Sequence, residues 1–398
     1  MKTQPSAWIS LIALAFFFFN GCTAPTPAPK VIRPPTLTLP FNQAKLAALD
    51  DAILKAIADK KLPGGVLWIE RNGVTHKKVY GHRSILPTTE PMTLDTVFDM
   101  ASLTKALATA PAIALLIERD KIELDAPVRH YIAEFSGEGR HQITVRHLLT
   151  HTSGLRPGLS LATPWIGTTA AVQLACREMP AAQEGTKFVY SDINFILLGE
   201  IVRRVSGLPL DEFVTRELFQ PLEMRSTCFR PSADLIARIA PTTATATNII
   251  RGIVHDPTAR RMGGVAGHAG LFATASDTAR FARMLLEGGS LNGQRVLETK
   301  TVRLMTSNQS PEPLTAKRGW GWDIDTGYSG PRGEHFPIGS FGHTGWTGTS
   351  IWIDPSSKSF VIFLSNRNHP DESGSVVALR KTIGTLAAEA IGLPDKRD

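Results

Sequence analysis

The chain has strand-like patterns near both of its ends, and this limits the folds that it can adopt. Two runs of β-forming residues between positions 65 and 80 flank Asn72-Gly73, a dipeptide that strongly favours a hairpin. Near the other end, residues 349–364 hold two more such runs around a cluster of turn-forming residues. We therefore expect one sheet to which both ends of the chain contribute.

Helical patterns occupy most of the sequence between these strands. Apolar residues recur at spacings of three and four through much of 102–286, interrupted by loops that contain Gly and Pro. Pro111 lies inside the first of these helical runs and should kink or divide it. Amphipathic helices are also predicted for 42–60 and 376–391, and a further strand for 320–324.

Together these patterns predict an α/β (α+β) fold. Its antiparallel sheet is built from both chain ends and flanked by helices, and a mainly helical domain is inserted between the two ends. The folded part spans 43–398, with about 43–110 and 311–398 in the sheet subdomain and about 111–310 in the helical one.

The N-terminus has the pattern of a targeting segment. Lys2 precedes an apolar run at 8–19, which is too short to span a bilayer as a helix, so we predict a removable signal peptide over 1–22. The Gly21-Cys22 junction resembles a bacterial lipoprotein cleavage box, in which the Cys becomes the lipidated first residue. The alternatives are cleavage nearby without lipidation and a free Cys22.

A Pro-rich segment follows at 23–42, and its composition predicts an extended tether that holds the domain off a membrane. We expect a protein that is secreted across the inner membrane, lipid-anchored and facing the periplasm. Thr23 is not a retention signal of the Asp type, which favours the outer membrane over the inner one.

Charge and cysteine content exclude some classes of function. The 43 basic and 36 acidic residues give a net charge of +7, but they are interspersed, and nucleic-acid binding would need a basic stripe. Cys176 and Cys228 can form a disulfide or remain two buried thiols, and the sequence leaves both open. No Cys/His spacing is typical of a zinc site, so no metal is expected.

Ser102 and Lys105 form the only Ser-x-x-Lys in the sequence, directly before a run of good helix formers. Residues three apart share a helix face, so the Lys105 amine can reach the Ser102 hydroxyl within one turn. A serine at a helix N-terminus also has free N–H groups nearby, which favour the negative charge of an attacked carbonyl oxygen. The motif therefore predicts acyl transfer, although a helix often begins with Ser for structural reasons alone.

Two further motifs lie far from Ser102 in the sequence. Tyr190 and Asp192 precede a helical pattern, where a tyrosine could simply pack at a loop–helix junction. The run from His343 to Trp346 enters a strand, where its glycine could simply permit a bend. In the order Ser-x-x-Lys, Tyr-x-Asp and His-Thr-Gly, however, the three resemble the motifs of the serine β-lactamase and penicillin-binding protein superfamily, in its class C and esterase-like branch. The resemblance covers about 43–391.

The resemblance implies a β-lactamase/transpeptidase-like fold and a role for each matching residue. Ser102 would be the acylated nucleophile, with Lys105 and Tyr190 sharing the role of base. The backbone N–H groups of Ser102 and Trp346 would form the oxyanion hole, and Thr344, followed by Gly345, would line the site beside the substrate. No cofactor is implied.

Two positions depart from the family pattern. Asp192 stands where class C enzymes usually have Asn, so it would repel the carboxylate of a β-lactam and could hold Lys105 charged, leaving more of the base role to Tyr190. His343 stands where classical β-lactamases have Lys, and it is mostly neutral at pH 7. We therefore expect weaker carboxylate recognition and a preference for neutral esters or peptides.

The expected function is a serine hydrolase that forms an acyl-enzyme at the cell envelope. An esterase, a D-alanyl-D-alanine carboxypeptidase-like enzyme and a weak β-lactamase all remain open, with a small ester, a D-Ala-D-Ala peptide or a β-lactam as substrate. The alternative is a penicillin- or cell-wall-peptide-binding protein that keeps the fold without turnover. His151 and Ser153 look like a second Ser/His pair but are interpreted as a structural turn, and it stays open whether His268 faces the cleft.

Overall fold

The computed structural model describes residues 41–244 and 248–393. The predicted signal peptide, Cys22 and the tether up to residue 40 lie outside these ranges. Within the described ranges no helix has the length and apolar content that a membrane crossing requires.

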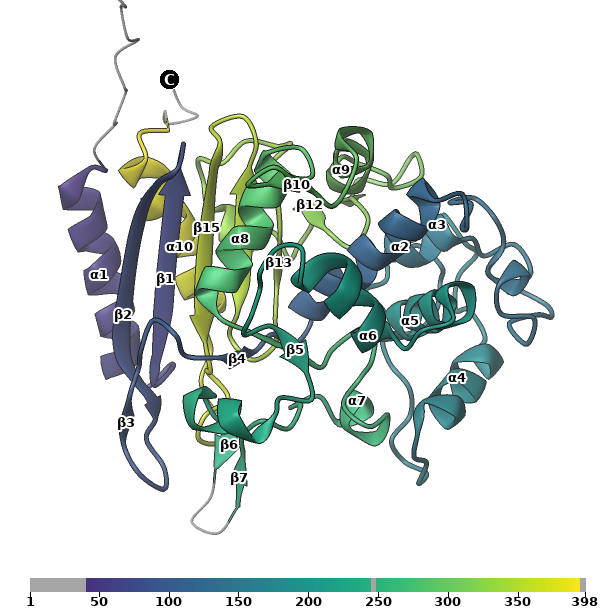
Figure 1. The fold of residues 1–398 in the computed structure, drawn as a ribbon, viewed down its shortest axis with the longest axis horizontal. Helices are drawn as coiled ribbons and strands as arrows, with labels where there is room; N and C mark the ends of the chain where they lie inside the picture. The colour runs from purple at the N-terminus through teal and green to yellow at the C-terminus, as the bar shows by residue number, and fades with distance from the viewer. Residues whose placement is uncertain (1–40, 245–247, 394–398) are drawn as a thin grey trace, which may run out of the picture. The chain divides into compact units, whose positions relative to one another are not determined.

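An eight-stranded antiparallel sheet forms the centre of the described chain, in the order β11-β12-β13-β14-β15-β1-β2-β3 (Figure 1). Strand β15 pairs with β1, so the two ends of the chain meet in the middle of the sheet, as the sequence predicted. The strands are β1 (Gly64–Arg71), β2 (Val74–Ser84), β3 (Glu90–Pro91), β11 (Lys317–Arg318), β12 (Asp323–Asp325), β13 (Phe341–Thr344), β14 (Ser350–Asp354) and β15 (Ser359–Ser365). The strand predicted for 320–324 begins only at Asp323, because Gly321 has a positive φ of 73° that interrupts extended backbone.

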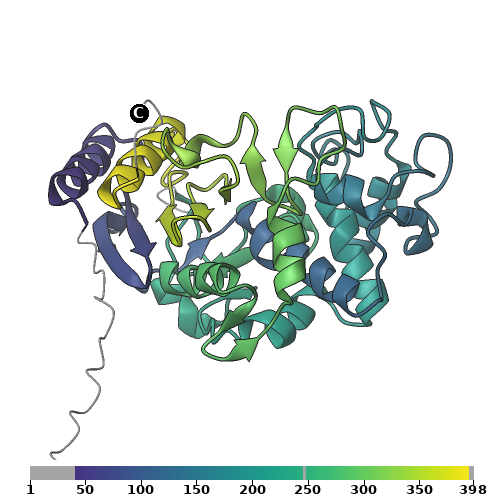
Figure 2. The same cartoon turned by 90° about the horizontal axis from the view of Figure 1, so that it is seen from above.

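Helices cover both faces of this sheet, which explains why the central strands β1, β14 and β15 are buried along almost their whole length. Helices α1 (Gln43–Ala58) and α10 (Val377–Ala390) lie side by side on one face, where Leu67 and Ile69 of β1 are buried (Figures 1 and 2). Val66 and Trp68 alternate with them and join the larger core on the other face. There α8 (Ala275–Leu286) packs on β1 and β15.

The region between the two halves of the sheet is mainly helical but also holds short strands. Pro111 falls in the first turn of α2, directly after a π-helical segment, and the backbone stays helical across Thr109 and Ala110. The hydrogen-bond pattern therefore changes from π to α just before Pro111, and the helix is not divided there. The elements are the π-helical segments Lys105–Thr109 and Thr215–Phe219, the 3₁₀ turns Val128–His130 and Ala233–Arg238, the helices α2 (Ala110–Glu118), α3 (Val145–Leu149), α4 (Thr168–Arg177), α5 (Asp192–Ser206), α6 (Leu210–Val214), α7 (Pro257–Arg261) and α9 (Thr299–Thr306), and the strands β4 (Phe98–Asp99), β5 (Cys228–Phe229), β6 (Thr243–Ala244), β7 (Ile249–Ile250), β8 (Leu271–Ala273), β9 (Ser290–Leu291) and β10 (Gln294–Arg295). A further 3₁₀ turn, Gly330–Arg332, lies between β12 and β13.

The alternatives left open for the cysteines are resolved by their positions. Cys176 is buried on α4, Cys228 lies in β5, and both are free thiols.

Candidate active site

Ser102 lies in a tight turn between β4 and the first helical residues. Ala101, just before it, has a φ of +47°, and its N–H donates to the Asp99 carboxylate at 2.8 Å. Asp99 is buried, and its other carboxylate oxygen accepts from the backbone N–H of His255 at 2.7 Å. This buried carboxylate therefore holds an unfavourable left-handed turn that presents Ser102 at the start of a helix.

Lys105 lies one turn further on, is fully buried, and contacts three groups. Its Nζ donates to Ser102 Oγ at 2.9 Å and to the backbone carbonyl of His268 at 3.0 Å, and it lies 2.7 Å from Asp192 Oδ1. Burial by itself lowers the pKa of Lys105, but the Asp192 carboxylate and the nearby Tyr190 outweigh burial, and the net pKa is raised. The geometry therefore favours a charged ammonium that donates to the Ser102 hydroxyl.

Tyr190 reaches the same place from the loop before α5. Its ring stacks on His151, with ring centroids 4.4 Å apart, and the Lys105 ammonium lies 5.0 Å from its centroid. His151 Nδ1 accepts from the Ser191 N–H at 3.0 Å, and burial holds the pKa of His151 well below its ordinary value. His151 thus positions the ring of Tyr190, which agrees with the structural interpretation of His151 and Ser153.

The turn after β13 is bonded to the backbone just before Ser102. Thr347 donates its hydroxyl to the Asp99 carbonyl at 2.7 Å, and Thr349 donates to the Met100 carbonyl at 3.2 Å. A Cβ on Gly345 would lie 2.5 Å from the Met100 carbonyl oxygen, so only glycine permits this approach. Within the described ranges the N–H groups of Ser102 and Trp346 form no hydrogen bond and are free to bind an oxyanion.

Ser102, Tyr190, His343, Thr344, Gly345 and Trp346 line one cavity of about 340 Å³. Lys105 contacts Ser102 from outside the set of lining residues, and Asp192 is paired with Lys105. The structure therefore brings all the residues of the three motifs to one place. The cavity also has lining residues that the sequence did not indicate, and they include Arg318, Asp323, Tyr328, Arg367 and Arg380. They belong to no recognisable motif.

Arg318 is fully buried and incompletely paired. Its Nη1 lies 3.5 Å from Asp323 Oδ1, but that carboxylate already accepts the hydroxyl hydrogens of Thr326 and Ser329. Its Nε and Nη2 make no hydrogen bond with any described residue. Burial lowers the pKa of Arg318, although a guanidinium stays charged at neutral pH.

His343 is the other unusual group of the cavity. Its Nδ1 donates to the Thr344 carbonyl at 2.8 Å, which leaves Nε2 as an acceptor. Burial, reinforced by the charges of Arg318 and Lys105, holds the pKa of His343 well below its ordinary value. His343 is therefore neutral at pH 7, and the fixed positive charge of the cavity wall comes from arginines that include Arg318.

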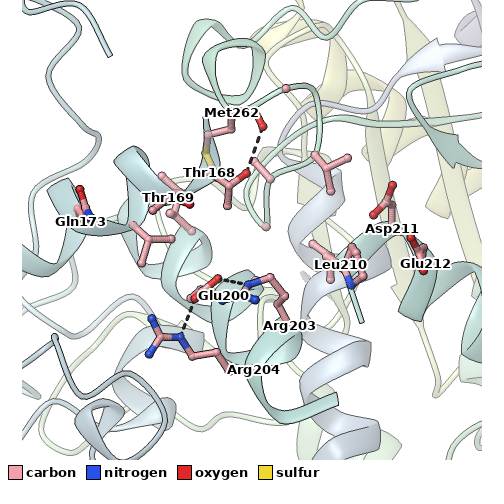
Figure 3. Close-up of a pocket in the computed structure, with 18 of the residues that line it drawn as sticks. Thr168, Thr169, Gln173, Glu200, Arg203, Arg204, Leu210, Asp211, Glu212 and Met262 are labelled. Carbon is pink, nitrogen blue, oxygen red and sulfur yellow. Dashed lines mark hydrogen bonds and ion pairs between the residues drawn. The ribbon is translucent and has the colours of Figure 1, made fainter. Parts of the chain in front are cut away.

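Two other features could be mistaken for the site. A larger cavity of about 670 Å³ lies among α4, α5 and α6 (Figure 3). Glu200 and its ion-pair partners Arg203 and Arg204 line this cavity, and no residue of the three motifs does. Asp192, Asp256 and His268 present possible metal ligands within 4.8 Å of one another. Because the Lys105 ammonium already neutralises Asp192, this trio is better described as part of an ion-pair network.

Similarities to known proteins agree with this geometry. The sequence model of the family described as Beta-lactamase matches residues 49–383. The chain is 30% identical over 423 residues to the N-acetylmuramyl-L-alanine amidase of Bacillus subtilis (strain 168), covering 94% of this chain and 95% of that protein. It is 29% identical over 368 residues to the "Putative D-alanyl-D-alanine carboxypeptidase" of Salmonella agona (strain SL483). That match covers 83% of this chain and 84% of the Salmonella protein.

Solved structures show the same fold at lower sequence identity. A class C beta-lactamase superposes with a TM-score of 0.70 at 21% identity and covers 87% of this chain and 96% of its own. "EstCE1, a hydrolase with promiscuous acyltransferase activity" superposes with a TM-score of 0.69, also at 21% identity. The superposition covers 88% of this chain and 98% of the EstCE1 chain.

Proposed function

Because the chain belongs to the beta-lactamase family and is a serine hydrolase of the β-lactamase/D,D-peptidase type, we propose that it cleaves peptides that end in D-alanyl-D-alanine. The resemblance to the serine β-lactamase and penicillin-binding protein superfamily, noted from three motifs, is thereby confirmed. The name of the Salmonella relative supports the choice of substrate, and the cavity beside Ser102 supports it independently.

The proposed reaction has two steps and uses only the residues of the site. In the proposed step Tyr190 acts as a phenolate stabilised by the charged Lys105. It takes the proton of the Ser102 hydroxyl as Oγ attacks the carbonyl carbon of the scissile amide, and it thereby becomes a neutral phenol. The N–H groups of Ser102 and Trp346 bind the oxyanion. The amide C–N bond then breaks, the proton passes to the leaving amine, and water hydrolyses the Ser102 ester.

The observation that carries the choice of substrate is the unpaired edge of Arg318. Nε and Nη2 lie on one edge of a guanidinium, and this edge binds a carboxylate through two parallel hydrogen bonds. A buried guanidinium without a full partner is costly, so a carboxylate that reaches this edge from the cavity would offset that cost. A terminal D-alanine supplies the carboxylate.

The net charge of the cavity favours the same substrate class. Arg318, Arg367 and Arg380 line it, against the single carboxylate of Asp323. The sequence led us to expect weak carboxylate recognition because His343 replaces a lysine. His343 is indeed neutral, but Arg318 provides a cation from a different strand. We therefore propose that the enzyme prefers a peptide with a free C-terminal carboxylate to a neutral ester.

The test compares one peptide in two forms. The kcat/KM of wild type is measured on an acetylated L-lysyl-D-alanyl-D-alanine peptide and on the same peptide with a C-terminal amide, and p-nitrophenyl acetate reports the basal esterase activity. We expect the acid to be preferred by about 10- to 100-fold, the value of one charge-assisted bidentate contact. Arg318→Gln should abolish this preference and leave ester hydrolysis intact.

Arg332→Gln is the matched control, because Arg332 is paired with Asp325 and does not line the cavity. An equal rate on the acid and the amide in wild type would contradict the proposed substrate. Binding of fluorescent penicillin without turnover of any of the three substrates would favour the alternative, a binding protein that keeps the fold.

The proposal places this hydrolase at the cell envelope, lipid-anchored through Cys22 and facing the periplasm. It rests on the apolar run 8–19, the Gly21-Cys22 junction and the Pro-rich segment up to residue 42. Metabolic labelling with a fatty acid tests it. Wild type should carry the label and Cys22→Ser should not, whereas unlabelled wild type would contradict lipidation.

A further inference from the structure

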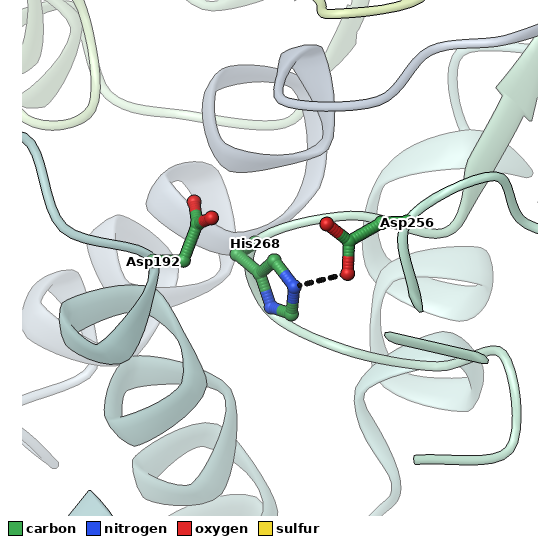
Figure 4. A group of neighbouring side chains, drawn as sticks. All are labelled: Asp192, Asp256 and His268. Atoms are coloured by element: carbon green, nitrogen blue, oxygen red, sulfur yellow. Dashed lines mark hydrogen bonds and ion pairs between the residues drawn. The ribbon is translucent and has the colours of Figure 1, made fainter. Parts of the chain in front are cut away.

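His268 lies in the loop between α7 and β8, and it contacts both the catalytic lysine and a second carboxylate. Its backbone carbonyl accepts from Lys105 Nζ at 3.0 Å. Its ring is only 1% exposed, and Nε2 lies 3.0 Å from Asp256 Oδ1 (Figure 4). The ring therefore does not reach solvent in the cleft, which answers the question that the sequence left open, and it is anchored directly behind Lys105.

The carboxylate that holds this ring is itself fixed. Asp256 Oδ1 also accepts from the Ala259 N–H at 2.7 Å, as the N-cap of α7. The neighbouring His255 N–H donates to Asp99, the buried carboxylate of the turn before Ser102. On the other side of the ring, the Gly267 carbonyl accepts from Thr109 at 2.7 Å, one helical turn beyond Lys105. The loop is thus bonded to both segments that carry Ser102 and Lys105.

The same arrangement places the Asp192 carboxylate in contact with the Lys105 ammonium and the Asp256 carboxylate within its electrostatic reach. Figure 4 shows His268 between Asp192 and Asp256, and one possible ligand atom of each lies within 4.8 Å of the others. The other titratable groups facing Lys105 are Tyr190, His151 and His343, and burial keeps both of these histidines neutral. The groups around Asp256 are His255, Arg260 and Asp99, besides His268 and Lys105.

We propose that Asp256 and His268 are positioning residues for Lys105: Asp256 holds the His268 ring, the His268 carbonyl holds the ammonium, and the Asp256 carboxylate acts with Asp192 to keep that ammonium protonated. This inference rests on the proposed acyl-enzyme function, keeps its division of roles, and adds the two residues that hold Lys105 in place. Lys105 serves as a fixed cation, and Tyr190 takes the proton from Ser102.

The pH dependence of ester hydrolysis separates this role from a merely structural one. Loss of one nearby carboxylate in Asp256→Asn lets Lys105 deprotonate at lower pH. The alkaline limb of kcat/KM for p-nitrophenyl acetate should therefore move down by about one pH unit. Asp277→Asn is the control, because Asp277 is also buried and bonded to Ser226 and Thr227 but lies outside the site, and its profile should match wild type.

Substitution of His268 tests the positional part. His268→Ala should lower kcat about 10- to 100-fold with little change in KM, the cost typical of a small misplacement of a catalytic group. His268→Gln keeps a donor that can reach Asp256 and should recover part of the loss. Wild-type kcat and an unshifted alkaline limb in both folded Asp256→Asn and His268→Ala would overturn the inference.

Three further results distinguish this inference from its rivals. A downward shift of the acidic limb in Asp256→Asn would overturn it, because neutral Lys105 would then be the base. Loss of activity on dialysis against EDTA, with recovery on addition of zinc, would overturn it in favour of a metal site at Asp192, Asp256 and His268. Wild type without any turnover would contradict the proposed function itself, whereas active wild type with unaffected variants contradicts only the positioning role.

Discussion

The Lys105 ammonium lies 2.7 Å from the Asp192 carboxylate, in a position where Lys105 is fully buried and Asp192 is partly exposed. A lysine in this environment without a partner would lose its proton, because burial disfavours the charged form. Asp192 therefore decides which protonation state Lys105 has when it contacts Ser102. From this ion pair we infer that Lys105 acts as a cation and that Tyr190 carries out the proton transfer.

Asp192→Asn tests this assignment. The raised pKa of Lys105 means that the pair stabilises the folded protein at neutral pH, and that this contribution is lost as the pH rises through the folded pKa. The variant should lose about 3 kcal/mol of stability at pH 7, the typical cost of breaking a buried pair, and the alkaline limb of its kcat/KM should move to lower pH. Urea unfolding and a pH–rate profile measure the two effects.

Asp125→Asn is the control for that prediction. Asp125 pairs with Arg146, but its side chain is 68% exposed, so its loss should cost less than about 1 kcal/mol. A pH–rate profile for Asp192→Asn that superposes on wild type would show that Lys105 does not act as a cation.

Gly345→Ala tests the oxyanion hole. The added Cβ would collide with the Met100 carbonyl and push the turn that carries the Trp346 N–H away from Ser102. Loss of one oxyanion donor lowers kcat by about 100- to 1000-fold, so ester hydrolysis should fall by that factor. Gly330→Ala adds a Cβ into open space and should behave as wild type. Normal turnover by Gly345→Ala would exclude Trp346 from the oxyanion hole.

Asp99 predicts an unusual dependence of stability on pH. Burial raises the pKa of Asp99 to about 6, although the N–H groups of His255 and Ala101 oppose the shift. The unfolded chain binds fewer protons than the folded one between the two pKa values, so stability should fall as the pH rises from about 4 to about 6. The loss from this group is on the order of 2–3 kcal/mol.

The comparison of wild type with Asp99→Asn isolates this effect from other titrating groups. The amide cannot ionise, so the difference in unfolding free energy between the two proteins should change across this pH range and be constant above it. Equal pH dependence in both proteins would show that Asp99 has an ordinary pKa.

The parts of the site that the sequence predicted are those with local geometry or a strong pattern. Ser102 and Lys105 are three residues apart, so helix geometry alone places the amine beside the hydroxyl. The hairpin around Asn72-Gly73 and the two β-forming runs within 349–364 were likewise enough to predict a sheet from both chain ends.

The parts that the sequence missed depend on tertiary contacts between distant segments. Arg318 comes from a two-residue strand, and only the pairing of that strand beside β12 brings it to the cavity of Ser102. Asp256 is bonded to the ring of His268, the residue whose carbonyl binds Lys105, and Asp99 accepts hydrogen bonds from the N–H groups of His255 and Ala101. An isolated Arg or Asp carries no periodicity, so nothing in the sequence separates these residues from surface charges.

Acylation of Ser102 is the most direct test of the whole account. Folded wild-type protein is treated with a reactive fluorophosphonate, and intact and peptide mass spectrometry locate the adduct. The account predicts one adduct, on Ser102, which is absent from Ser102→Ala and still forms on Ser160→Ala. Folded wild type that remains unmodified, or an adduct on any other side chain, would contradict it.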